Sequence, residues 1–238
     1  MKRYAVCLII AILTLTTGCA YYPHLTGIPL IKEKGDTRIE GGVAMYSPSA
    51  HLSVSHGATK NLALQVAAST GAVDKEYYAQ SAIGYYKNIQ NMTILELYGG
   101  FGFGYGDAYK DATGGNLKGN YQIYFAQFNV GNIGRKFPNV EYGLGFKSGY
   151  LHSKMTDYNY FYHYDHYPQN QPYPVYFLNG IIVEPTFFTR FGGKNLKFNV
   201  AMGPCWMIQF THTDKRFPVA GNLGIGVSYS FGGKSKQN

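Results

Sequence analysis

Alternation of large apolar residues with small or polar ones is the feature of this sequence that most constrains its fold. Between Leu196 and Phe210, one face collects seven large apolar side chains, whereas the other carries mainly small or polar residues. A tilted strand of about 9–11 residues crosses a bilayer. A two-faced run of this length therefore predicts a membrane-spanning strand rather than a strand of a soluble sandwich. The run Leu223–Phe231 alternates in the same way.

The same rule, applied to the rest of the chain, predicts an all-β, transmembrane, antiparallel up-and-down β-barrel of about ten strands. Tight turns rich in Gly and Asn alternate with connections that are mostly longer and more polar, as in a bacterial outer-membrane barrel. Because the first two strands have the weakest pattern, an eight-stranded barrel with a periplasmic hairpin at 37–57 stays open as an alternative. The predicted strands are 37–46, 50–57, 61–70, 77–87, 92–105, 120–132, 139–152, 175–191, 196–211 and 219–231.

Composition agrees with a barrel. Charged residues make up 14% of the chain and aromatic residues 16%, whereas soluble domains carry about 25% charged residues. The mean hydropathy is nevertheless slightly polar, which argues against a helical membrane protein. A wall with one lipid-facing side, one polar side and aromatic belts accounts for both properties.

The first residues have the pattern of an export signal. Lys2 and Arg3 precede an apolar run, Tyr4–Leu15, which is shorter than the roughly 20 residues of a spanning helix. Thr16–Cys19 then resembles the lipobox of lipoprotein signal peptidase, so we expect lipidation at Cys19, with ordinary signal-peptide cleavage as the alternative. The expected organisation is a signal peptide at 1–18, a lipid-anchored linker at 19–36, the barrel at 37–232 and a C-terminal tail at 233–238.

Eight charged residues of the predicted strands fall on the inward face, in the register that the apolar positions set. Four are acidic and four are basic, and none of them falls on the apolar face. A Lys or Arg facing mid-bilayer lipid would cost roughly 2–4 kcal/mol. We expect a paired network that fills the lumen, and a selective pathway is the alternative. The eight are Arg38, Glu40, Glu96, Glu141, Lys147, Glu184, Arg190 and Lys197.

The connection 153–174 is crowded with tyrosines, which offer a large contact area and a polar tip at low entropy cost. It is therefore the predicted recognition element. The histidines and aspartates there, with His212 and Asp214, suggest a metal site or a protease-like site as alternatives. No spacing motif supports either, so we predict no metal, no cofactor, no catalytic residues and no enzyme. The candidate ligand-binding residues are Tyr158, Tyr160, Tyr162, His163, Tyr164, Asp165 and His166.

The stretch after Cys19, from Tyr21-Tyr22-Pro23 through Gly27–Asp36, resembles the start of uncharacterised outer-membrane β-barrel lipoproteins of Bacteroidota. The resemblance implies fold and location and carries no activity. Lipoproteins that those bacteria export to the surface often have acidic residues directly after the lipidated cysteine. Ala20–Pro23 has none, so the resemblance favours an anchor on the periplasmic side of the outer membrane.

Two classes of function follow from these features. The first is a structural or surface-interaction barrel with a filled lumen, and the second is a small pore for ions or a narrow solute. Charges of both signs in the lumen favour the first class. The expected partners are outer-membrane lipid, lipopolysaccharide and a surface ligand or protein at the outer loops. No motif supports binding of nucleic acid.

Overall fold

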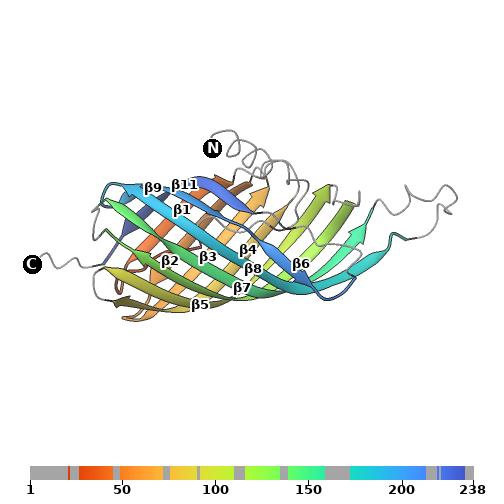
Figure 1. Ribbon diagram of the computed structural model, residues 1–238, viewed down its shortest axis with the longest axis horizontal. Coiled ribbons are helices and arrows are strands. Elements are labelled where there is room, and N and C mark those ends of the chain that lie inside the picture. Colours follow the sequence, from red (N-terminus) through yellow and green to blue (C-terminus); the bar gives the residue numbers. More distant parts are fainter. Residues whose placement is uncertain are drawn as a thin grey trace, which may run out of the picture.

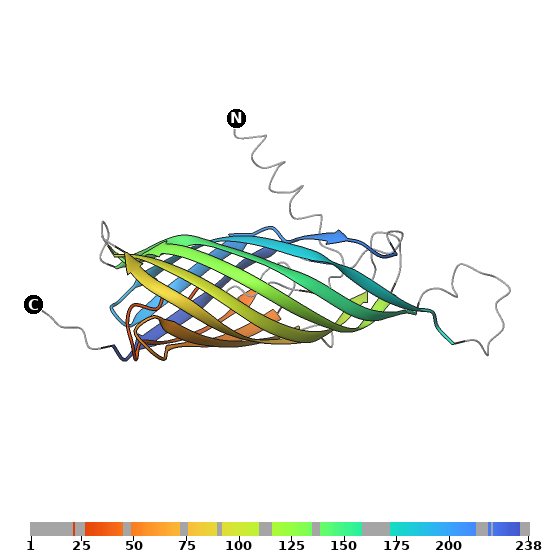
Figure 2. The same cartoon turned by 90° about the horizontal axis from the view of Figure 1, so that it is seen from below.

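The computed structural model shows the chain as an antiparallel barrel (Figures 1 and 2). It describes residues 21, 27–44, 49–71, 76–89, 92–109, 116–134, 139–158, 172–212, 219 and 221–233. The strands are β1 (Thr37–Ala44), β2 (Ser49–Gly57), β3 (Leu62–Gly71), β4 (Tyr77–Ile89), β5 (Thr93–Tyr109), β6 (Asn116–Asn132), β7 (Val140–Asp157), β8 (Val175–Gly192), β9 (Leu196–Gly203), β10 (Trp206–Gln209) and β11 (Asn222–Phe231). Over these ranges the structure contains no helix that is long and apolar enough to cross a membrane.

Backbone pairing closes the wall. Consecutive strands pair from β1 to β8, β8 pairs with both β9 and β10, β9 pairs with β11, and β11 returns to β1. Because β9 and β10 are two parts of one wall strand, the described part of the chain forms a closed barrel of ten strands. This confirms the predicted fold. The eight-stranded alternative is wrong, because β1 and β2 lie in the wall between β11 and β3.

The interruption between β9 and β10 falls at Pro204 and Cys205. Proline has no backbone N–H to donate to a ladder, so the regular pairing stops there. Met202 nevertheless pairs with Phe187 and Trp206 pairs with Val183, so the register is the same on both sides of the break. The alternation of faces therefore continues through it.

The two mouths of the barrel differ. The turns after β2, β4, β6 and β8 lie at one end, here called the short-turn mouth, which is on the left in Figure 1. The opposite end is the long-loop mouth. Strands β5 to β8 have 17 or 18 residues, whereas β1, β2, β3 and β11 have 8 to 10. The wall is therefore tall on the β5–β8 side and low beside β1 and β11.

Strands β5, β6 and β7 extend farther toward the long-loop mouth than the apolar alternation in the sequence predicted. The expected polar connection 107–119 is shorter in the structure, because β5 continues to Tyr109 and β6 begins at Asn116. Asp107 lies opposite Lys118 in the ladder, and Lys118 Nζ is 2.8 Å from Asp107 Oδ2. Here the backbone pairing of the two strands continues beyond the apolar part of the wall, and the residues that extend it include polar ones.

The outer face of the wall is apolar. In β9, Leu196, Phe198 and Met202 are 53%, 58% and 50% exposed, while Lys197 and Ala201 between them are buried in the interior. The same alternation runs through β3 and β4. A continuous apolar outer surface of this kind is the lipid-facing band of an outer-membrane-type barrel.

Replacing Val66, which faces outward in the middle of β3, by Arg should lower the free energy of unfolding. A cation near the bilayer midplane costs roughly 2–4 kcal/mol, and near the interface about 0–1 kcal/mol. The matched control is Leu196→Arg at the first residue of β9. Denaturant unfolding in lipid vesicles measures both. Equal effects of the two substitutions would contradict a lipid-facing position for Val66.

Candidate functional site in the barrel lumen

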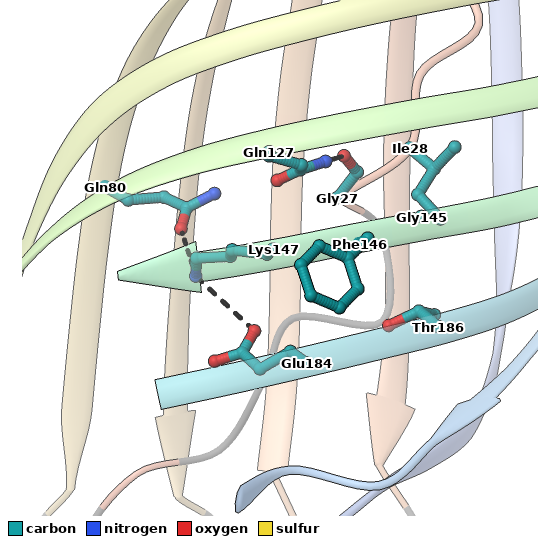
Figure 3. A pocket seen from close by; sticks show the side chains of 9 residues that line it. All are labelled: Gly27, Ile28, Gln80, Gln127, Gly145, Phe146, Lys147, Glu184 and Thr186. Carbon is teal, nitrogen blue, oxygen red and sulfur yellow. Dashed lines mark hydrogen bonds and ion pairs between the residues drawn. The ribbon is translucent and has the colours of Figure 1, made fainter. Parts of the chain in front are cut away.

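A segment from the N-terminal part of the chain occupies the lumen. This lumen segment comprises Tyr21 and Gly27–Asp36. Tyr21, Leu30 and Ile31 have no exposed surface, and Ile28 is 3% exposed. Figure 3 shows Gly27 and Ile28 among inward-pointing side chains of the wall. The sequence predicted only a linker at 19–36. The structure instead places the described residues of this region inside the barrel.

Polar side chains of the wall bind the backbone of the lumen segment. Glu96 Oε1 accepts a hydrogen bond of 2.7 Å from the Ile31 N–H. Gln127 Nε2 donates to the Gly27 carbonyl, and Arg190 Nη2 donates to the Ile28 carbonyl. Irregular backbone at membrane depth is tolerated only where protein or water satisfies its polar groups. These wall residues perform that role for the lumen segment.

Glycines in the wall make room for the lumen segment. A Cβ atom at Gly145 would lie 2.5 Å from Ile28 Cδ1, and one at Gly57 would lie 2.6 Å from the carbonyl oxygen of Glu33. Both distances are shorter than side chains tolerate without a shift. Gly99, which faces outward, has no atom within 4 Å of such a position. Small inward residues and bulky lumen residues are therefore complementary in shape.

A charged cluster lies near the short-turn mouth. Arg38 of β1 contacts Glu141 of β7 across the lumen, with Nη1 and Nη2 at 2.7 and 3.3 Å from the two carboxylate oxygens. Arg190 Nη2 lies 2.7 Å from Glu40 Oε1, and its Nη1 lies 3.6 Å from Glu141. Lys32 of the lumen segment joins at 3.5 Å from Glu141. Apart from Lys32, all of these side chains are at most 2% exposed. We call these five residues the mouth cluster.

A second charged group lies deeper in the barrel, around Lys147. Its Nζ is 3.7 Å from Glu184 Oε2, 3.2 Å from Gln80 Oε1 and 2.8 Å from the Tyr21 hydroxyl (Figure 3 shows the first two contacts). The ammonium also lies 4.6 Å from the centre of the Phe125 ring, within range of a cation–π interaction. Lys147 thus joins strands β4, β7 and β8 to the lumen segment.

The structure places all eight sequence-predicted charges in the interior. Six of them form the ion pairs just described. Glu96 instead accepts hydrogen bonds from Asn129 Nδ2, at 2.9 Å, and from Ile31 N–H. Lys197 donates to the Asn139 carbonyl at 3.4 Å. Sequence reasoning missed the lumen segment and its amide partners, although the inward glycines were a signal that bulky groups must fill the barrel.

The sequence-predicted lipidation site and most of the predicted recognition loop lie outside the described residues. Tyr158 is described, and its ring lies 4.8 Å from the Tyr173 ring, centroid to centroid, where the connection leaves β7 and returns to β8. No group of three or more His, Cys, Asp or Glu side chains in the described part of the chain is arranged to hold a metal ion. The residues outside are Cys19, Tyr160, Tyr162, His163, Tyr164, Asp165 and His166.

A small cavity lies beside the Gly27–Ile28 part of the lumen segment. A cavity of about 20 Å³ borders Ile28, Gln127, Lys147 and Glu184 (Figure 3). A volume of this size holds about one water molecule. At this cavity, the described segment and the wall side chains therefore leave room for about one water molecule.

Comparison with known proteins supports the fold alone. No protein-family model and no curated protein matches the sequence. Among solved structures, the chain is similar to the outer membrane protease OmpT from Escherichia coli, with a TM-score of 0.53 and 10% identity over 84% of this chain and 94% of that one. CdiB from Acinetobacter baumannii gives a TM-score of 0.31 and 10% identity over 74% of this chain and 32% of that one. The OmpT match assigns the chain to the outer-membrane-type β-barrel fold.

Replacing Glu141 by Gln should strongly destabilise the barrel, because Arg38 would lose its partner in a buried site. Removing one member of a buried ion pair typically costs about 3–5 kcal/mol. The matched control is Asp107→Asn, which breaks the more exposed pair with Lys118 and should cost about 0–1 kcal/mol. Denaturant unfolding of both variants tests this. A loss at Glu141 no larger than at Asp107 would refute a structural role for the mouth cluster.

Proposed function

We propose that this protein is a plugged outer-membrane barrel with a structural or surface-interaction role. The observation that carries the proposal is the lumen segment, whose backbone is bound by Glu96, Gln127 and Arg190. Two further observations support it: the Arg38–Glu141 contact spans the lumen, and the cavity beside Ile28 has room for about one water molecule. A filled interior suits a protein whose action takes place at its surface.

The alternative is a small pore for ions or a narrow solute. Selective pores usually carry rings of charge of one sign along their path. Here arginines and lysines face carboxylates at 2.7 to 3.7 Å in both charged groups, so their charges largely cancel. This pairing favours the plugged barrel over the pore.

The proposal places the mature protein in the outer membrane as a lipoprotein. Its support is the N-terminal sequence, in which a positively charged start, a short apolar run and a lipobox-like Thr16–Cys19 follow one another. Cys19 would carry the lipid. The proposal includes no enzymatic activity, because no catalytic spacing motif is present in the sequence, and the 10% identity to OmpT concerns the fold.

The proposed contact surface is the connection between β7 and β8. It joins the two longest strands, whose outer ends rise above the low part of the wall. Its tyrosine-rich composition suits binding of lipopolysaccharide, a glycan or a protein. The ring contact between Tyr158 and Tyr173 holds the two ends of this connection together.

We expect the refolded full-length protein to be silent in single-channel recordings in planar bilayers, because the lumen segment blocks the path. A variant lacking residues 21–34 should give ion-conducting steps, because that deletion removes the bound backbone and Tyr21. Heat-modifiable mobility in gels checks that both proteins are folded. Stable steps in the full-length protein, as large as those of the deletion variant, would overturn the proposal in favour of the pore.

Shortening the connection between β7 and β8 should abolish surface binding without loss of the barrel. Purified lipopolysaccharide is the first probe. Replacing 159–171 by a short Gly-Ser linker should lower its affinity at least about tenfold, or roughly 1.4 kcal/mol. The matched control replaces 110–115, between β5 and β6, by the same linker. If lipopolysaccharide binding is unchanged in both variants, or is reduced equally in both, the 153–174 connection is not the element that recognises lipopolysaccharide.

A further inference from the structure

The lumen segment has a direction. Its last residue, Asp36, directly precedes Thr37, which begins β1 at the short-turn mouth and pairs with Phe231 and His56. Its first residue, Tyr21, lies elsewhere: its ring contacts Tyr78, the second residue of β4, near the long-loop end of that strand. The segment therefore runs along the barrel axis, with Tyr21 toward the long-loop mouth.

Tyr21 is held firmly at that position. Its ring packs edge-on against Tyr78 and Tyr121, with centroid distances of 5.5 and 5.8 Å, and its hydroxyl accepts a hydrogen bond from Lys147. Its backbone forms a parallel bridge with Val219, in the connection between β10 and β11 at the long-loop mouth. Tyr21 is fully buried among these groups. These contacts fix the position of Tyr21 along the barrel axis.

Described side chains and the lumen segment occupy the barrel on the short-turn side of Tyr21. Gln80, Gln127 and Lys147 lie there together with the lumen segment. The cavity between them measures about 20 Å³. That space is far smaller than a polypeptide strand needs, because it holds about one water molecule.

We propose that the chain is threaded through its own barrel. It enters at the long-loop mouth, passes Tyr21, leaves the lumen after Asp36 and then forms the wall. Because long loops face outward and short turns face the periplasm in bacterial barrels, the mature N-terminus is displayed on the cell surface. This inference rests on the proposed outer-membrane location. It is independent of whether the barrel conducts ions.

The threaded course changes the expected side of a lipid anchor. Cys19 lies outside the described residues. It precedes Tyr21 by two residues, which span at most about 7 Å, so it must lie within that distance of Tyr21. A lipid on Cys19 would then enter the outer leaflet, rather than the periplasmic leaflet suggested by the residues that follow the cysteine. The low wall beside β1 and β11 offers an acyl chain a short path from the long-loop mouth to lipid.

Accessibility of the segment before Tyr21 on intact cells tests the threading. The full-length chain receives the same short Gly-Ser-Cys-Ser-Gly insertion at one of three places: between Ala20 and Tyr21, after Pro172 or after Asn195. Pro172 is an exposed residue of the long-loop side, and Asn195 is an exposed residue of a short turn. A membrane-impermeant maleimide is the probe, and the unmodified protein gives the background from its own cysteines.

The insertion before Tyr21 should be labelled on intact cells as strongly as the insertion after Pro172, while the insertion after Asn195 reacts only once the outer membrane is permeabilised. Labelling before Tyr21 only after permeabilisation, or in neither condition, would overturn the threaded course. Heat-modifiable mobility confirms that each protein is folded. If the full-length protein does not conduct but the insertion before Tyr21 is labelled only from the periplasm, the threaded course is refuted and the plugged barrel stands. If the full-length protein conducts, the plug is refuted and the threaded course is not.

Discussion

Satisfaction of backbone hydrogen bonds in lipid is the constraint on which the rest of this structure depends. A sheet in a membrane must close, because an edge strand would leave N–H and C=O groups without partners in hydrocarbon. The pairing of β11 with β1 closes this barrel, and the pairing of β8 with β10 continues the wall past Pro204. Closure creates an interior that neither lipid nor an adjacent sheet can fill. The arrangement of the lumen follows from that need.

Two kinds of group fill the interior, and each depends on the other. Buried ions are costly unless they are paired, and Glu141 meets this requirement by contacting Arg38, Arg190 and Lys32 together. An irregular backbone segment is costly unless its polar groups are bound, and Arg190 contributes to both tasks by contacting Glu40 and the Ile28 carbonyl. The plug and the charge network are therefore one structure, since removing either leaves buried partners of the other unsatisfied.

The strands and their faces could be predicted from the sequence, because the two-residue period of a strand records burial directly. Leu196, Phe198 and Met202 face outward as the alternation indicates, and the ten-strand prediction is confirmed. Strand ends were less accurate: β5 to β7 continue with polar residues at the long-loop mouth, where the apolar signal has ended. The pairing partners of the inward charges could not be predicted. Arg38 and Glu141 are 103 positions apart, and only barrel closure brings them together.

The amino-acid sequence alone determined the class of fold, the sidedness of each strand and which charges point inward, because these properties follow from local periodicity and from the cost of placing charge in lipid. The tertiary structure decided what fills the barrel. The lumen segment has no regular period, and its fit depends on Gly57, Gly145 and Gln127, which come from three different strands. Complementarity of that kind exists only after closure, when residues far apart in the chain surround one space.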